Sequence, residues 1–324
     1  MKYSRDNVGR ILLDEYPALV ANIYRAHDGH RSIWDVWCHA LHHAAAVSEE
    51  IRRGPFIGKL PEELADFTLW LFTAVHKLSG KFGQPRSAAE DPEERFIRIQ
   101  SNCSNLLWHK YPGVCPRCFQ RRVVQSEREI KHPSPCECLL HDLGRQDESG
   151  RRQNLEALRE FSRKRADLKP KSIDEWQQML GDIFEANVRQ MQMTDVALRL
   201  MEELGKASDA MIRMYSYTEG KFQLGEPNWR QMKLEAQLAD VFSWLFGLVE
   251  KLGRLKHACT NHKVQPDAES LDSPRLSEII WRRYGSDDAH SFFCPFCKGT
   301  VCSCPIVLVP ATKPAEELKA KFQY

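Results

Sequence analysis

Eight of the eleven cysteines in this chain fall into two clusters that repeat one pattern, a CPxC pair followed by a CxC pair. The cysteines are Cys115, Cys118, Cys136 and Cys138 in the first cluster and Cys294, Cys297, Cys302 and Cys304 in the second. Four thiolates at such spacing can surround Zn²⁺ tetrahedrally, and a site closed by four cysteines is structural rather than catalytic. We therefore predict two structural zinc sites. A redox-active thiol pair and an iron–sulfur cluster are the alternatives.

An apolar helix pattern precedes each cysteine cluster, and its two copies align without gaps. Residues 66–78 match residues 240–252 in the leading Asp, the central Trp-Leu-Phe and the final Lys-Leu. Further on, Trp108 and Tyr111 match Trp281 and Tyr284. The chain therefore reads as an internal duplication, and each half can be interpreted against the other.

Helix signals recur in the same order in both halves, and strand signals are confined to the cysteine regions and residues 306–309. Capping residues and apolar spacing predict helices over 8–25, 33–53, 61–79 and 91–111, and again over 173–179, 194–215, 231–255 and 274–284. The expected fold is all-α, with two four-helix repeats that each end in a cysteine knot. The expected domains are 1–140 and 171–306, joined by a charged helical connector over 141–170 and followed by a tail over 307–324.

Composition narrows the class of protein. The 324 residues suffice for two domains, and 42% hydrophobic with 28% charged residues is typical of a globular chain. No apolar run reaches the length of a membrane span, and the first residues lack a secretory signal, so we expect a cytoplasmic protein without a membrane partner. A net charge of +2 argues against non-specific electrostatic binding of nucleic acid by the protein surface as a whole. Local basic residues near the first knot, such as Arg121 and Arg122, leave nucleic-acid binding as a weaker alternative.

One pair of segments carries a family resemblance. Residues 200–206 read Leu-Met-Glu-Glu-Leu-Gly-Lys, and residues 238–241 read Leu-Ala-Asp-Val. Over roughly residues 173–252 the chain resembles the MazG-like all-α nucleotide pyrophosphohydrolases, whose pattern is Glu-Glu-x-x-Glu on one helix and Glu-x-x-Asp on the next. The resemblance implies a helical bundle, usually formed by dimerisation, that cleaves a nucleoside triphosphate to a monophosphate and pyrophosphate. Here the two halves would form an intrachain pseudo-dimer, or would pair with a second chain in a homo-oligomer.

The acidic residues of the second half would hold the catalytic cation. Carboxylates three or four residues apart share one helix face, so Glu202, Glu203 and Asp240 are the expected ligands of Mg²⁺ or Mn²⁺. Such a cation neutralises phosphate charge and activates a water. Lys206 stands where the family has its third Glu, and Gln237 replaces the Glu of Glu-x-x-Asp. We therefore expect weakened or altered catalysis.

The first half departs in the complementary way, because Glu63 and Asp66 keep Glu-x-x-Asp while the Glu-Glu position reads His-His. Three interpretations follow. In the first, the second half holds a working site in which Lys206 contacts phosphate, with Glu63 and Asp66 as a second cation site. Alternatively, His39 and His43 join Glu63 and Asp66 on a transition metal, which imidazole favours. In the third, the pair is a catalytically silent, zinc-stabilised nucleotide sensor or assembly scaffold.

Overall fold

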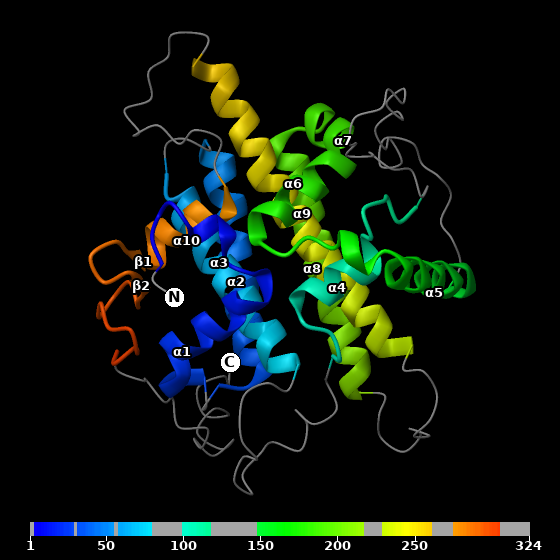
Figure 1. The fold of residues 1–324 in the computed structure, drawn as a ribbon, viewed down its shortest axis with the longest axis horizontal. Helices are drawn as coiled ribbons and strands as arrows, with labels where there is room; N and C mark the ends of the chain where they lie inside the picture. Colours follow the sequence, from blue (N-terminus) through cyan, green and yellow to red (C-terminus); the bar gives the residue numbers. More distant parts are fainter. Residues whose placement is uncertain are drawn as a thin grey trace, which may run out of the picture.

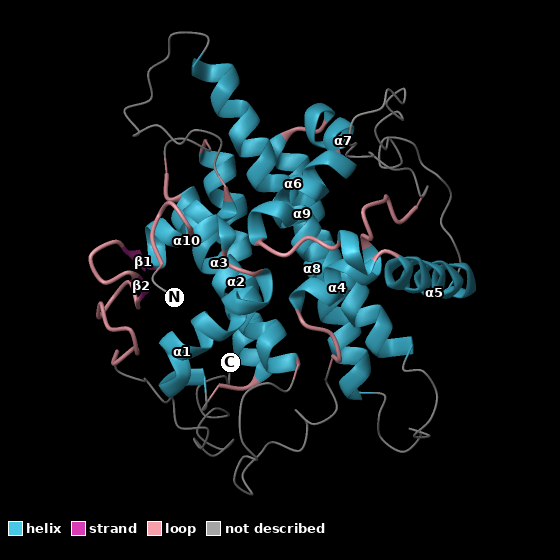
Figure 2. Cartoon of the chain, viewed as in Figure 1, coloured by secondary structure: helices cyan, strands magenta, loops and turns pink. Residues whose placement is uncertain are grey.

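The computed structural model describes residues 3–28, 31–54, 58–79, 99–117, 148–216, 229–260 and 275–304. These residues are predominantly helical, which confirms the predicted all-α class, and one short hairpin lies at the edge of the molecule (Figure 1 and Figure 2). The elements are η1 (Val8–Arg10), η2 (Leu13–Glu15), α1 (Tyr16–Asp28), α2 (Ile33–Arg53), α3 (Leu60–Leu78), α4 (Cys103–Lys110), α5 (Glu148–Lys164), η4 (Ala166–Leu168), α6 (Ile173–Ile183), α7 (Glu185–Gln190), α8 (Met193–Ser216), α9 (Trp229–Thr260), α10 (Leu276–Tyr284), β1 (Gly285–Ser286) and β2 (Ser291–Phe292). The predicted strand over 306–309 lies outside the described residues.

Local capping fixes several helix ends where the sequence predicted them. Ser32 opens α2 through a reciprocal capping box with Asp35, and Ser172 opens α6 in the same way with Glu175. Gly54 ends α2 with a backbone φ of 126°, a conformation that glycine adopts without the steric penalty of a side chain. Each cap satisfies backbone groups that a helix end otherwise leaves unpaired.

Two predicted helices are shorter than their periodicity indicated. The helix expected over 8–25 begins at Tyr16, because Pro17 belongs in a first turn and cannot continue a helix from its N-terminal side. The helix expected over 91–111 has its start outside the described residues, and α4 begins only at Cys103. Before it, the Glu235 carboxylate accepts the backbone N–H groups of Gln100 and Ser101 at 3.0 and 3.2 Å, which holds this segment out of a helix.

Helix packing crosses between the two halves of the sequence. The α2–α3 pair and the α8–α9 pair form the centre, and α2 packs on α8. The last helix of each half contacts the other half: α4 packs on α9, and α10 packs on α3. Figure 1 shows α10 beside α3, and α4 beside α9. Each half thus has its own central helix pair, and the last helix of each half also packs on the other half.

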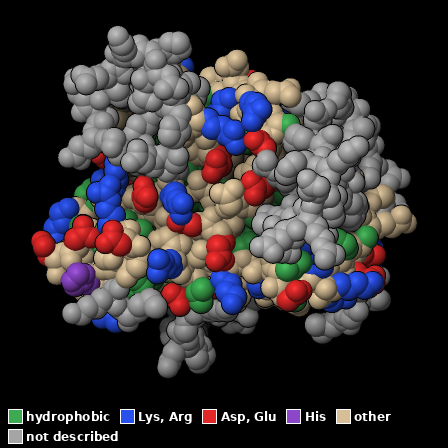
Figure 3. Space-filling view, turned by 45° about the horizontal axis from the view of Figure 1, so that its top comes forward, with side chains coloured by type: hydrophobic (Ala, Val, Ile, Leu, Met, Phe, Trp, Pro, Cys, Tyr) green, Lys and Arg blue, Asp and Glu red, His purple; other side chains and the backbone are tan. Residues whose placement is uncertain are grey.

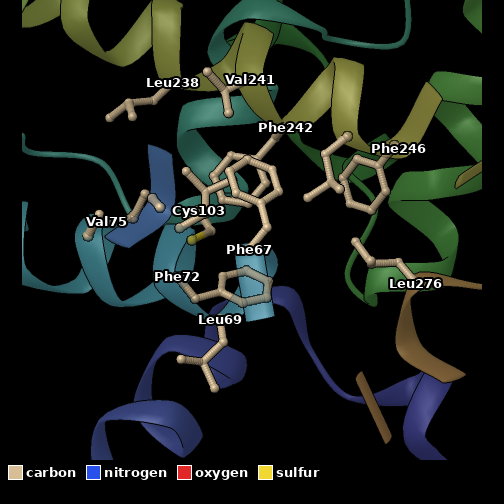
Figure 4. Close-up of a cluster of buried hydrophobic side chains, with 14 of the residues drawn as sticks. Phe67, Leu69, Phe72, Val75, Cys103, Leu238, Val241, Phe242, Phe246 and Leu276 are labelled. Atoms are coloured by element: carbon tan, nitrogen blue, oxygen red, sulfur yellow. The ribbon is translucent and has the colours of Figure 1, made fainter. Parts of the chain in front are cut away.

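The hydrophobic core is continuous across these helices. Phe67 and Phe72 of α3 meet Phe242 and Phe246 of α9, and all four are at most 1% exposed (Figure 4). The rings of Phe72 and Phe242 lie 5.7 Å apart between centroids. Removing one such buried ring typically lowers the free energy of unfolding by about 3–5 kcal/mol. Both halves therefore depend on the same core.

Candidate functional site

The second cysteine cluster converges on one point. The Sγ atoms of Cys294, Cys297, Cys302 and Cys304 all lie within 4.8 Å of one another. The Sγ distances are 3.9 Å between Cys294 and Cys304 and 4.0 Å between Cys297 and Cys302. A tetrahedral site with Zn–S bonds of about 2.3 Å has S···S edges of about 3.8 Å. The four thiols are thus a candidate metal centre.

A tight turn brings the two cysteine pairs together. The N–H of Cys294 donates to the carbonyl of Gly299 at 2.9 Å. A Cβ atom at Gly299 would lie 2.6 Å from the carbonyl oxygen of Val301, so this turn requires glycine. The Ser303 N–H points at the Cys297 Sγ at 3.4 Å. Backbone N–H groups, that of Ser303 first, lower the pKa of Cys297 to about 6, so they favour the thiolate that binds metal.

The cluster is anchored to the helices of the first half. The Cys302 N–H donates to the carbonyl of Ile23 on α1 at 2.7 Å. Phe292, just before the cluster, makes edge contacts with the rings of Tyr16 and Trp281 at 6.2 and 5.2 Å between centroids. Of the first cluster only Cys115 is described, and it is buried. Cys118, Cys136 and Cys138 lie outside the described residues.

Asp240 on α9 lies at the centre of a polar contact with α4. Its carboxylate accepts the Tyr111 hydroxyl and pairs with the Lys110 ammonium. Burial and the charge of Asp240 raise the pKa of Tyr111 well above its usual value, so the phenol stays a neutral donor. Both partners of Asp240 therefore come from the segment that precedes the first cysteine cluster.

Glu203 on α8 is close enough to Asp240 for their charges to interact. Burial, then the Asp240 charge, raises the pKa of Glu203 to about 7. Its Oε1 pairs with Lys206 at 2.9 Å, whereas its Oε2 is buried without a hydrogen-bond partner. Glu202 is more exposed, and it pairs with Arg199 and Lys206 at 2.7 Å each. The contact with Lys206 lowers the pKa of Glu202.

These carboxylates line a pocket of about 680 Å³ between helices α4 to α9. That volume suits a small-molecule ligand. Four acidic residues line the pocket against six basic ones, which are Lys110, Arg117, Arg151, Arg199, Lys206 and Lys233. The excess of cations favours an anionic ligand. Across the described residues, only the four-cysteine cluster brings three or more potential ligand atoms within 4.8 Å, so Glu202, Glu203 and Asp240 converge less closely.

Several buried polar atoms in the pocket wall have no hydrogen-bond partner. They include both amide atoms of Asn187 and the Oε1 of Gln237, besides the Glu203 Oε2. Most buried polar groups in folded proteins are paired. The unpaired atoms of this wall are therefore able to form hydrogen bonds with a polar ligand or with water.

In the first half, both oxygens of the corresponding carboxylate, Asp66, already have hydrogen-bond partners. Asp66 on α3 accepts two hydrogen bonds from Arg283, with Nε and Nη2 each 3.0 Å from a separate carboxylate oxygen. It also accepts the hydroxyl of Tyr284. Arg283 packs over the Phe296 ring at 5.7 Å. Asp66 is therefore fully engaged by residues at the end of α10.

The histidines of α2 are engaged separately. His43 Nδ1 lies 2.8 Å from the Glu63 carboxylate. The His39 ring stacks on Trp70 with 4.3 Å between centroids, and burial lowers the pKa of His39. Within the described part of the chain, His39 and His43 form no close ligand group with Glu63 and Asp66.

Four partners were not predicted as site residues: Lys110, Tyr111, Arg283 and Tyr284. The tyrosines had a signal, because they occupy matching positions in the repeat, but the sequence alignment marks them only as repeat residues. On the face in Figure 3, basic and acidic side chains are interspersed, which does not favour a nucleic-acid-binding stripe. No helix among the described residues has the length and apolarity to cross a membrane.

Comparison of the chain with protein-family models, curated proteins and solved structures found no match.

Proposed function

We propose that the chain is a divergent MazG-like nucleotide pyrophosphohydrolase with one working site, the pocket between α4, α8 and α9. The main support is the meeting of Glu203 and Asp240, which come from different helices, in a cavity of about 680 Å³ whose cations outnumber its acids. A nucleoside triphosphate has the size and charge that this cavity favours. Its products would be a monophosphate and pyrophosphate.

In this proposal the two halves form an intrachain pseudo-dimer, and reciprocal contacts support it. The Leu13 N–H donates to Lys171 at 2.9 Å, and the Ile173 N–H donates to Ile11 at 3.4 Å. The two carboxylates that follow, Asp14 and Asp174, each bind a serine near the start of a fourth helix, Ser104 and Ser277. When two halves are related by a two-fold axis, each contact from the first half to the second is matched by the same contact from the second half to the first.

The residues of the pocket fit a divalent cation in chemical type. Glu203 has an unpartnered carboxylate oxygen, and Glu202 and Asp240 supply further hard oxygen donors. When bound, the cation would neutralise phosphate charge and lower the pKa of a bound water. Lys206 already pairs with both glutamates, so we expect weak affinity for the cation.

The side chains of the pocket have separate roles in this proposal. Lys206 and Lys110 bind phosphate oxygens when they leave their carboxylates. Tyr111 orients the Asp240 carboxylate through its hydroxyl. Glu203 has a pKa of about 7, and its Oε1, free once Lys206 binds phosphate, takes the proton of the attacking water. The water oxygen then bonds to the α-phosphorus, and the bond to the bridging oxygen breaks to release pyrophosphate.

A second candidate is nucleotide binding without hydrolysis. It is favoured by the lysines, because Lys206 bridges Glu202 and Glu203 while Lys110 pairs with Asp240. In that case the lysines take the place of the cation, and the pocket senses nucleotide.

A pyrophosphate-release assay over a panel of nucleoside triphosphates, with Mg²⁺ or Mn²⁺, tests the proposal. We expect release that falls about 10²-fold or more in Glu203→Gln, the scale expected when a group that stabilises the transition state is lost. Glu49→Gln, on the exposed surface of α2, is the matched control and should be unchanged. Release that Glu203→Gln leaves untouched would contradict this site. Binding of nucleotide without release would favour the second candidate.

We also propose zinc as the metal of the cysteine clusters. Elemental analysis of the purified chain should find two zinc ions per molecule, and Cys297→Ser should leave about one. Iron or labile sulfide in place of zinc would instead support an iron–sulfur cluster. Since the second cluster contacts α1 through Cys302, zinc removal should also lower the melting temperature.

A further inference from the structure

Asn187 on α7 is the most unusual polar residue in the pocket wall. Its side chain is 1% exposed, and neither Nδ2 nor Oδ1 has a hydrogen-bond partner. A buried amide without partners destabilises a fold, because it has lost its water and gained nothing in exchange. A ligand that supplies one acceptor and one donor would remove that penalty.

The surroundings of Asn187 suit a flat, largely apolar ring. Phe184, Val188 and Trp244 line the same pocket. Gly247 on α9 also lines it, and a Cβ atom there would find only Val188 nearby, at 3.9 Å. Glycine inside a helix is unfavourable relative to alanine, so its presence here is explained by the room it leaves.

The pocket is long enough to separate this end from the charged end. Gln237, Asp240, Trp244 and Gly247 follow one another on a single face of α9, at steps of three or four residues. At 1.5 Å per residue, the face from Gln237 to Gly247 is about 15 Å long. Asp240 with its lysine lies along that face, and Gly247 with its aromatic neighbour lies at the far end. This spacing separates a phosphate-binding region from a ring-binding region.

We infer that Asn187 binds the edge of the nucleobase through both amide atoms, with Trp244 and Phe184 against its faces. The inference rests on the proposed function, because it assigns the base-binding end of the same pocket. An amide offers a donor beside an acceptor. It therefore pairs with a base edge that carries the complementary pair, as asparagine does with adenine.

A second buried amide provides a matched control. Gln177 on α6 is also buried, but its Oε1 accepts the Leu276 N–H at 2.9 Å and its Nε2 donates to Glu250 at 3.0 Å. Gln177 has a structural role, since it joins α6 to α9 and α10. Replacing each amide by leucine should thus have opposite effects: Gln177→Leu lowers the melting temperature, and Asn187→Leu leaves it unchanged or raises it.

The test is calorimetric binding to the full-length chain. The probes are inorganic triphosphate and the α,β-methylene triphosphates of adenosine, guanosine, cytidine and uridine, which cannot be cleaved at that bond. We expect the preferred nucleotide to bind more tightly than triphosphate, and Asn187→Leu to weaken it about five- to hundredfold while sparing triphosphate. Asn187→Asp presents two acceptors, and it should shift preference towards guanine, whose edge carries two adjacent donors.

The outcomes separate this inference from the function it rests on. If triphosphate and nucleotides bind but Asn187→Leu changes neither affinity nor ranking, the role of Asn187 is wrong and the pocket assignment stands. If none of the probes binds to the wild-type chain, both proposals fail. A melting temperature that falls as far in Asn187→Leu as in Gln177→Leu, with nucleotide affinity unchanged, would assign Asn187 a structural role instead.

Discussion

Asp66 and Asp240 occupy matching positions in the two halves, and their surroundings differ in the paired cation and in the facing residue. Each accepts a tyrosine hydroxyl and a cation from the last helix of the opposite half. At Asp66 the cation is Arg283, which uses two nitrogens. At Asp240 it is Lys110, a single ammonium, and the facing residue is Glu203 with an unpartnered oxygen.

The difference shows how the same pair of helices can hold either a fully paired carboxylate or one that can still bind a ligand. The planar arginine fork saturates both oxygens of a carboxylate, whereas a lysine is a point charge that leaves acceptor capacity free. Near Asp66, Glu62 pairs with the same Arg283 and Glu63 contacts His43, so both acids already have partners. The Asp240 side keeps a pocket with unsatisfied polar atoms.

The largest expected effect is a difference between the two aspartates in the unfolding free energy that is lost when each is replaced by asparagine. Asp66→Asn leaves the Arg283 guanidinium with only the longer contact to Glu62, at 3.5 Å. Because the Asp66 and Arg283 side chains are 12% and 23% exposed, we expect a loss of about 2–3 kcal/mol, below the range for fully buried pairs. Asp240→Asn also leaves a cation, Lys110, without its carboxylate, but it removes the repulsion between Asp240 and Glu203, so we expect a smaller loss than for Asp66→Asn. Urea unfolding measures both, and equal losses would mean that the two sites are equivalent.

The next effect is a pH dependence of the unfolding free energy, which we expect from Glu203 beside Asp240. Burial raises the folded-state pKa of Glu203 to about 7, from 4.5. The protonated form is therefore favoured in the fold, and stability present below about pH 4.5 is lost as the pH rises through 7. We expect a loss of about 2–3 kcal/mol between pH 4.5 and 8 that Glu203→Gln removes. Urea unfolding across this range provides the measurement. A slope that both Glu203→Gln and Asp240→Asn leave intact would assign it to other groups.

The smallest effect comes from restoring the third carboxylate of the family pattern. Lys206→Glu replaces a cation beside Glu202 and Glu203 with an acid, so Mg²⁺ should bind roughly tenfold more tightly, as monitored by calorimetry. Ala46 is the matching position of the first half. Ala46→Glu should produce no comparable gain, because Asp66 is occupied by Arg283. Equal gains at both positions would contradict the contrast between the halves.

The sequence predicted those features that depend on local chemistry. Capping residues located α2 and α6, and cysteine spacing identified the group from Cys294 to Cys304. It did not predict which helix covers which, because an apolar face does not specify its partner. The contact of Asp66 with Arg283 joins positions 217 residues apart. The late start of α4 depends on Glu235, which lies in the other half.

The placement of α10 on α3 has a consequence for biosynthesis. The surface of α3 that α10 covers is made early, and α10 leaves the ribosome more than two hundred residues later, as the residue numbers of the two helices require. Until then the nascent first half carries an uncovered apolar surface, which is the kind of surface that chaperones bind. Severing the connector would recreate that condition permanently in both fragments. We therefore expect the separated halves to be recovered in soluble form only when they are co-expressed.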